Sequence, residues 1–194
     1  MTGRLLIAST LSLSLWACSF GDRSVVLTVD RPVGIPEIPR GISVVLELPE
    51  DRRPEPHDVV GSVRSGVGMK TADIFSDKDV REWIHQAMTQ ELQHAGFLIA
   101  RSSIPGLALR VTTEIRDLAC EESIGFRARM TLKVRVQGDG RTLLDRSYEE
   151  RDSHVVITRT SGKDAADSLR TCLRKIVSQF VKDLVMLVER DPSQ

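Results

Sequence analysis

Two stretches that alternate between apolar and polar residues constrain the fold of this chain most. In the first, from Leu107 to Ile115, every second residue is apolar apart from Thr113. In the second, from Phe126 to Val136, arginine, lysine and threonine lie between the apolar positions. Successive side chains of a strand point to opposite faces, so each stretch predicts a strand with one buried and one hydrated face. Such alternation is typical of antiparallel sheets.

Two more strands are predicted around this pair. Gly138-Asp139-Gly140 is typical of a hairpin turn, after which residues 141–151 return as a less regular strand that 154–160 would prolong. An earlier strand is predicted from Ile42 to Leu48, where apolar residues again alternate with others.

Two helices complete the predicted domain. Apolar residues recur near a 3.6-residue period from Val80 to Ala95, after Ser76 and Asp79 at the spacing of a capping box and before the helix stop Gly96. A second helix is expected from about residue 164 to 189. We therefore expect a single α+β domain over residues 41–191. It should hold an antiparallel sheet of about four strands with two helices packed on one face, in the order β-α-β-β-β-α.

Residues 49–75 are predicted to form a long irregular loop, because prolines and glycines interrupt any strand or helix pattern there. Asp51, Arg52, Arg53 and Arg64 lie in this segment. A partner-docking loop is one interpretation and a mobile loop without a role is the other. Composition does not decide between them.

The first 17 residues are typical of a lipoprotein signal peptide. A single cation, Arg4, precedes the apolar run Leu5–Leu15, and the small residue Ala17 precedes Cys18. The apolar run is shorter than the roughly 20 residues needed to span a bilayer. We expect Cys18 to receive lipid and to become the mature N-terminus. Residues 18–40, rich in proline and glycine, then form a tether in which residues 24–29 have the composition of an edge strand.

The composition excludes several classes of function. Basic and acidic residues balance at 27 each, which gives no support to binding of nucleic acid through bulk charge. Gly68-Met69-Lys70-Thr71 is not a phosphate-binding loop, because Met69 separates the glycine from the lysine. The four histidines show no metal-ligand spacing, and no Gly-X-Ser-X-Gly motif is present. We expect no nucleotide, metal or cofactor, and no catalytic residues.

The cysteines and the hydrated strand faces leave alternatives open. With Cys18 lipidated, Cys120 and Cys172 remain as a pair that an oxidising compartment would join in a disulfide, or as two small buried apolar residues. The hydrated face of the strand from Phe126 carries the basic residues Arg127, Arg129, Lys133 and Arg135. These cations either bind anionic envelope material or are neutralised by Glu114, Asp145 and Glu149.

The order of these features resembles the YajG-like family of bacterial outer-membrane lipoproteins. The resemblance includes the cysteine after the signal segment, the strand Ile42–Leu48 leading into Asp51-Arg52-Arg53, and the helix end Glu91-Leu92-Gln93-His94-Ala95-Gly96-Phe97. The later strand, the hairpin at Gly138 and the closing helix follow in the same order. The resemblance implies a protein anchored in the outer membrane through Cys18, as does Ser19 in place of aspartate after the cysteine.

We expect a lipid-anchored, non-enzymatic protein whose domain faces the periplasm. It would bind or scaffold another envelope macromolecule, in the manner of an auxiliary subunit, and the expected partner is a protein. A lipid- or glycolipid-binding module of an envelope transport system is the first alternative, and it requires an apolar groove. A cell-wall hydrolase is the second, and it requires converging catalytic side chains.

Overall fold

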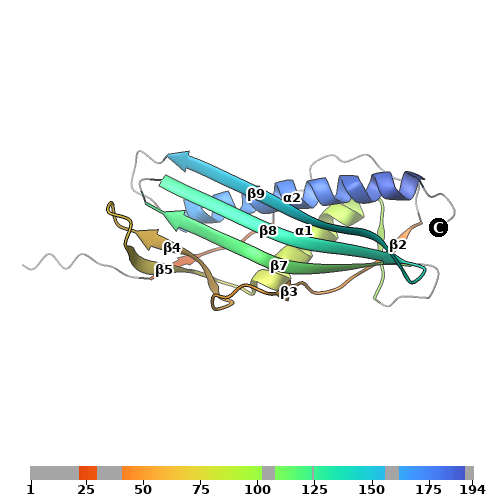
Figure 1. Ribbon diagram of the computed structural model, residues 1–194, viewed down its shortest axis with the longest axis horizontal. Coiled ribbons are helices and arrows are strands. Elements are labelled where there is room, and N and C mark those ends of the chain that lie inside the picture. Colours follow the sequence, from red (N-terminus) through yellow and green to blue (C-terminus); the bar gives the residue numbers. More distant parts are fainter. Residues whose placement is uncertain (1–21, 30–40, 102–107, 124, 156–161, 191–194) are drawn as a thin grey trace, which may run out of the picture.

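A computed structural model describes residues 22–29, 41–101, 108–123, 125–155 and 162–190. Over these residues the chain forms one mixed sheet of nine strands, with two helices covering one face (Figure 1). The expectation of a small antiparallel sheet with four strands is therefore wrong. Both helices do lie on the same face of the sheet, as the alternation predicts (Figure 1).

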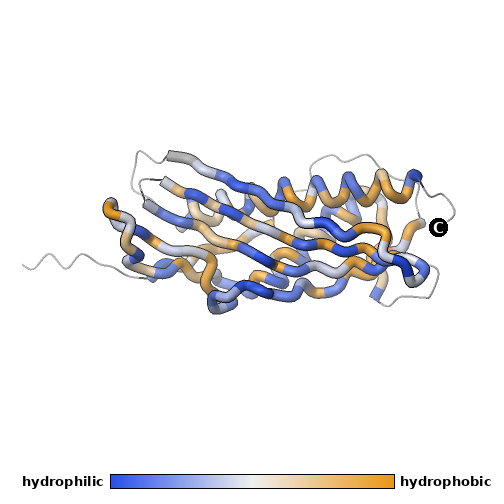
Figure 2. The backbone as a smooth tube through the Cα atoms, in the orientation of Figure 1, coloured by the Kyte–Doolittle hydropathy of each residue, from blue (hydrophilic) through white to orange (hydrophobic). Residues whose placement is uncertain are grey.

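Three long antiparallel strands form one half of the sheet. β7 (Ala108–Glu122), β8 (Gly125–Gly138) and β9 (Arg141–Val155) pair in sequence order, with β8 in the middle. Hydrophobic and hydrophilic residues alternate along β7 and β8 (Figure 2), and the apolar set of β8 is buried from Phe126 to Val136. Asp139 and Gly140 both have positive φ, the backbone of the tight turn predicted between β8 and β9.

The other edge of β7 pairs with three short strands that follow one another along it. β2 (Ser43–Leu46), β3 (Glu50–Asp51) and β4 (Val59–Arg64) are all parallel to β7. A strand rises about 3.4 Å per residue, so the 15 residues of β7 span about 50 Å, which is long enough for all three. Residues 43–64 therefore run along β7 as one interrupted edge.

The remaining strands extend the sheet beyond these pairs. β5 (Lys70–Ser76) is antiparallel to β4, β1 (Arg23–Val25) is parallel to β5, and β6 (Leu98–Ile99) is parallel to β2. Residues 49–75, expected as an irregular loop, thus contain three strands, and that expectation is wrong.

Gly61 shows why composition hides these strands. A Cβ atom at this position would lie 2.1 Å from the carbonyl oxygen of Cys120, so the close approach of β4 to β7 requires glycine. In the sequence the same glycine counts against a strand. The pairing partner that compensates for it is some 60 residues away.

Residues 22–29, part of the predicted tether, pack against the domain. Val25 of β1 and Leu27 are buried in the core, and the indole Nε1 of Trp83 donates a hydrogen bond of 2.8 Å to the carbonyl oxygen of Thr28. The backbone N–H of Leu27 donates to Asp77 at 2.9 Å. The described N-terminal segment is therefore part of the fold, as a strand at the edge of the sheet. β3, β6 and β9 likewise pair with a single described strand each.

The two helices begin and end close to the predicted positions. α1 (Val80–His94) has Asp79 as its N-cap, whose carboxylate accepts the N–H of Arg81 at 2.8 Å. Gly96, at φ +98°, follows its C-terminus. α2 (Gly162–Arg190) places one apolar stripe on β8 and β9. Trp83, Ile176 and Phe180 lie on the buried faces of these helices and are each 1% exposed.

Phe180 tests this packing. We expect Phe180→Ala to lower the free energy of unfolding by about 3–5 kcal/mol, because truncation of a buried aromatic side chain leaves a cavity. The neighbouring residue Gln179 is exposed, so Gln179→Ala should change it by about 0.5 kcal/mol or less. Denaturant unfolding measures both. Equal midpoints for the two variants would contradict the assigned helix face.

Candidate functional site

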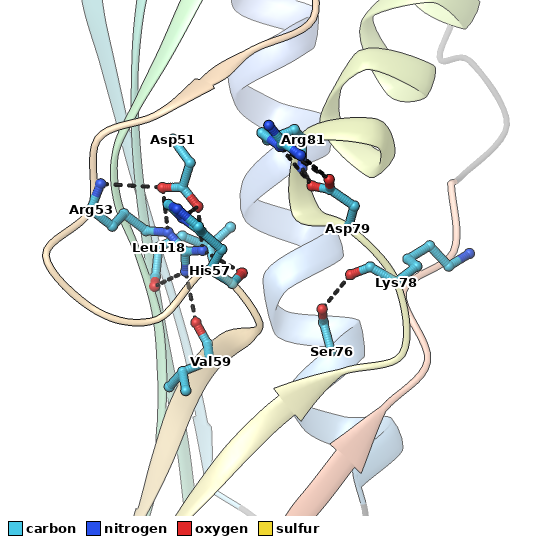
Figure 3. Close-up of polar contacts among 9 residues, drawn as sticks. All are labelled: Asp51, Arg53, His57, Val59, Ser76, Lys78, Asp79, Arg81 and Leu118. Atoms are coloured by element: carbon cyan, nitrogen blue, oxygen red, sulfur yellow. Dashed lines mark hydrogen bonds and ion pairs between the residues drawn. The ribbon is translucent and has the colours of Figure 1, made fainter.

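A buried ion pair lies in the segment predicted as a docking loop (Figure 3). The guanidinium of Arg53 donates to both carboxylate oxygens of Asp51, at 2.9 and 2.7 Å, and the two side chains are only 1% and 2% exposed. Arg53 also donates to the carbonyl oxygens of Val59 at 2.8 Å and His57 at 2.9 Å. These bonds tie the end of β3 to the start of β4 along the edge of β7.

The Asp51 carboxylate is held in its charged form by this network. Burial alone would raise the pKa of Asp51, but the hydrogen bonds and charge of Arg53 and the imidazole of His57, 3.0 Å away, lower it below its ordinary value of 3.8. Each member of a buried ion pair supplies the counter-charge of the other, and loss of either one is strongly destabilising. Asp51 and Arg53 therefore hold the chain in place and are not available to a partner.

The other two predicted docking residues lie at the surface. Arg52 is half exposed and pairs with Glu50 at 2.8 Å. Arg64, at the end of β4, is 39% exposed and lies 3.3 Å from Glu121. The structure thus separates the four residues into an internal pair and two surface arginines. The signal for the internal pair was its spacing, since Asp51 and Arg53 are two residues apart on one face of an extended chain.

The internal pair can be tested against its surface neighbours. We expect Asp51→Asn to lower the free energy of unfolding by about 3–5 kcal/mol, because it leaves the buried Arg53 cation without a counter-charge. Glu50→Gln removes only the exposed pair with Arg52 and should cost about 0–1 kcal/mol. Chemical denaturation near pH 7 measures the difference, and equal costs would contradict the buried role of Asp51.

The same pair gives a dependence on pH. Because folding lowers the pKa of Asp51, its contribution is fully present above pH 3.8 and is lost as the pH falls through the lower value of the folded state. The stability difference between the parent and Asp51→Asn should therefore shrink on acidification below about pH 4. A difference that grows in acid would contradict the sign of this shift.

The basic residues on the outer face of the sheet are largely paired with carboxylates. Arg129 lies 2.7 Å from Asp117, and Lys133 and Arg135 lie 3.4 and 2.9 Å from Asp145. Glu114 pairs with Arg116, and Glu149 pairs with Arg151. These contacts favour the neutralised interpretation of this face over an anion-binding one.

Cys120 and Cys172 are both buried, one on β7 and one on α2. Burial is the main reason that the pKa of Cys120 rises to about 12 and that of Cys172 to about 11. A protonated thiol is a poor nucleophile, so both cysteines are inert as buried thiols.

The disulfide between them stays a prediction, and thiol counting tests it. Cells are lysed without any alkylating agent, so that native thiols stay unmodified. The protein is then unfolded and its free thiols are titrated. The bridge predicts no free thiol in the mature chain. Two thiols that react only after unfolding would contradict it and would assign both cysteines to the core as small apolar side chains.

Among the described residues, no group of His, Cys, Asp and Glu could hold a metal ion. His57 contacts Asp51, and His85 lies 3.3 Å from the carbonyl oxygen of Leu46, so these histidines stand apart. None of the described helices has the length and apolar character needed to cross a membrane.

The outer edge of β9 is the longest unpaired feature of the sheet. All 15 residues of β9 lie beside β8, and no described strand pairs with their other side. α2 is fastened to the inner face of β9, because Asp183 accepts hydrogen bonds from Arg146 at 2.7 Å and from the hydroxyl of Tyr148 at 2.8 Å. Ser147, Glu149 and Arg151 are exposed on the outer face.

Comparison with known proteins identifies the family of this chain. Residues 37–186 match the family Lipoprotein_16, described as "Uncharacterized lipoprotein". The chain belongs to this family. A lipoprotein is held at a membrane of the cell envelope by its lipid. No curated protein matches the lipoprotein.

Several solved structures are similar to this chain at low identity. Protein XCC0632 from Xanthomonas campestris, of the family DUF330, is 12% identical with a TM-score of 0.62, and the match covers 90% of this lipoprotein and 100% of that chain. Hypothetical protein CT253 from Chlamydia trachomatis is 10% identical with a TM-score of 0.49, over 75% of this chain and 98% of that one. Lipoprotein GNA1162 from Neisseria meningitidis is 10% identical with a TM-score of 0.40, over 77% and 99%. The likeness to XCC0632 shows a common fold and no more.

Proposed function

We propose that this lipoprotein is a non-enzymatic envelope protein that binds another envelope protein through the outer edge of β9. The observation that carries the proposal is the length of this edge. β9 is 15 residues long, and the backbone groups of about every second residue point away from β8, with no strand partner among the described residues. An exposed edge is a template on which an extended segment of another chain can add a strand.

The composition of β9 supports a specific partner. Proline is absent from it, and seven of its 15 residues are charged, which discourages unspecific pairing along the edge. On its outer face Asp145, Glu149 and Arg151 differ in sign, and a partner strand would have to match them because like charges directly opposite one another are destabilising. Since Asp183 holds α2 on the inner face, the partner would approach the edge and the outer face.

The packing of the domain favours docking over lipid binding. A lipid- or glycolipid-binding module needs an apolar cleft, and here the described space between helices and sheet is filled by large side chains. Trp83, Phe126 and Phe180 are each 1% exposed in one continuous core. The hollow on the outer face of the sheet is lined instead by charged residues, among them Glu121, Arg127 and Arg151.

The proposal includes the cellular location of the protein. Membership of a lipoprotein family and the sequence before Cys18 support lipidation at this cysteine. We further propose that the protein is YajG-like, is anchored in the outer membrane and faces the periplasm. The surface arginines Arg52 and Arg64 define the alternative docking site.

Cross-linking in living cells tests the docking site. A photoreactive side chain is placed at Ser147 or Ser153 on the outer face of β9, and we expect both to cross-link to the same protein, identified by mass spectrometry. The matched control is Ala119 on β7, which shares this face and lies two strands in from the edge. It should give no product.

Three other outcomes would contradict the edge as the site. A cross-link from Ala119 as strong as that from Ser153 would move the contact to the face of the sheet. Cross-links only from Arg52 or Arg64 would move it to the segment around β3 and β4. Unrelated products from Ser147 and Ser153 would mean that the edge has no dedicated partner.

A further inference from the structure

The turn between β4 and β5 presents two apolar side chains to solvent. Val67 is 80% exposed and Met69 is 65% exposed, the highest values among the exposed large hydrophobic residues that the structure describes. Single exposed apolar residues are ordinary on protein surfaces. Here two lie in one turn, which Figure 2 shows as a hydrophobic tip at the left of the molecule.

This turn is held in one conformation by its backbone. Across the turn, the N–H of Ser65 donates a hydrogen bond to the carbonyl oxygen of Met69 at 2.8 Å. The guanidinium of Arg64 donates to the carbonyl oxygen of Gly68 at 3.0 Å, and Gly68 adopts φ +86°. The backbone groups are thus satisfied within the turn, and the two apolar side chains project from it.

β1, the first described strand, begins at the end of the sheet where this turn lies. β1 is parallel to β5, with Arg23 opposite Ile74, and the carboxylate of Asp22 accepts the N–H of Asp73 at 3.3 Å. Moving back along β1 towards Cys18 therefore follows the same direction as moving back along β5 towards Met69 (Figure 1).

The segments 18–22 and 69–73 can extend about equally far from the start of the sheet. Cys18 precedes Asp22 by four residues, which span at most about 14 Å when fully extended. Met69 likewise precedes Asp73 by four residues, about 14 Å in a strand. The tip thus reaches about as far towards the anchor as Cys18 can. With Cys18 at the bilayer surface, the tip is therefore able to reach that surface as well.

We propose that Val67 and Met69 insert into the interfacial layer of the bilayer beside the lipid anchor. The occupant of this surface is thus a phospholipid membrane, and the inference rests on the proposed lipidation of Cys18. Arg64 and Lys70 flank the tip and pair with Glu121 at 3.3 Å and Asp73 at 2.5 Å, so the two apolar side chains supply the attraction to the bilayer. The domain then stands on two attachments, the acyl chains and the hairpin, which together limit its rotation about the short linker.

Tryptophan fluorescence tests the insertion. The mature chain that begins at Cys18 has one tryptophan, the buried Trp83, which contributes equally to every variant. The lipidated Val67→Trp protein is reconstituted into phosphatidylethanolamine and phosphatidylglycerol vesicles with brominated acyl chains. We expect a blue-shifted emission and the loss of most of the added fluorescence by bromine quenching. Met69→Trp should behave in the same way.

The matched control is Thr142→Trp, just after the turn between β8 and β9. This turn lies at the other end of β8, whose 14 residues span about 45 Å. Its added fluorescence should not be quenched. Equal quenching at positions 67 and 142 would overturn the inference, because the domain would then lie flat on the membrane.

Two further measurements separate this inference from the proposed anchor. Mass spectrometry of the mature N-terminus shows whether Cys18 carries lipid, and flotation shows whether the protein stays with the vesicles. Lipid on Cys18 and full flotation, with Val67→Trp and Met69→Trp unquenched, would overturn the insertion and leave the anchor intact. An N-terminus without lipid would overturn both.

Discussion

The backbone pairing of β7 on both of its edges is the constraint on which the rest of the structure depends. One edge is paired with β8 from Arg110 to Glu122. The other is paired with β2, β3 and β4 in turn. Buried N–H and C=O groups must find partners, so both edges of this central strand have to be paired, and here three separate segments lie along one of them. Gly61 and the Asp51–Arg53 pair lie where these segments meet β7.

Many charged residues of the sheet form ion pairs or hydrogen bonds within this arrangement. Arg53 sits inside the edge with five hydrogen-bond contacts to protein groups, and Asp145 binds two cations on the outer face. Their roles are to hold segments together and to keep the outer face neutral. The proposed partner site and the proposed membrane contact therefore lie at two features that the folding of the sheet does not use, the edge of β9 and the apolar tip of the β4–β5 hairpin.

These two features are related by the direction of the strands. β9 begins at the turn far from the N-terminus and ends at the same end of the sheet as the hairpin tip (Figure 1). With the tip on the membrane, the edge of β9 would run away from the bilayer surface. A partner strand added there would extend outwards by about 50 Å, the length of 15 residues. The anchor and the docking edge would then act together, since the first sets the orientation of the second.

Local pattern was enough to determine β7, β8, β9 and both helices, because each carries its own periodicity and end signals, such as Asp79, Gly96 and Asp139-Gly140. It also determined that the helices share one face, since the buried set of Phe126 to Val136 needs a cover. Pattern did not show β3, β4 and β5, whose strand character comes from a distant partner and whose glycines and prolines argue against it locally. The burial of Arg53 was decided in the same way, because an arginine in a proline-rich segment becomes internal only when β7 and the start of β4 close around it. Tertiary structure alone brought Asp22 beside Asp73, and so placed the start of β1 at the same end of the sheet as the β4–β5 hairpin. Such contacts depend on hydrogen bonds between segments about 50 residues apart, which no local spacing encodes.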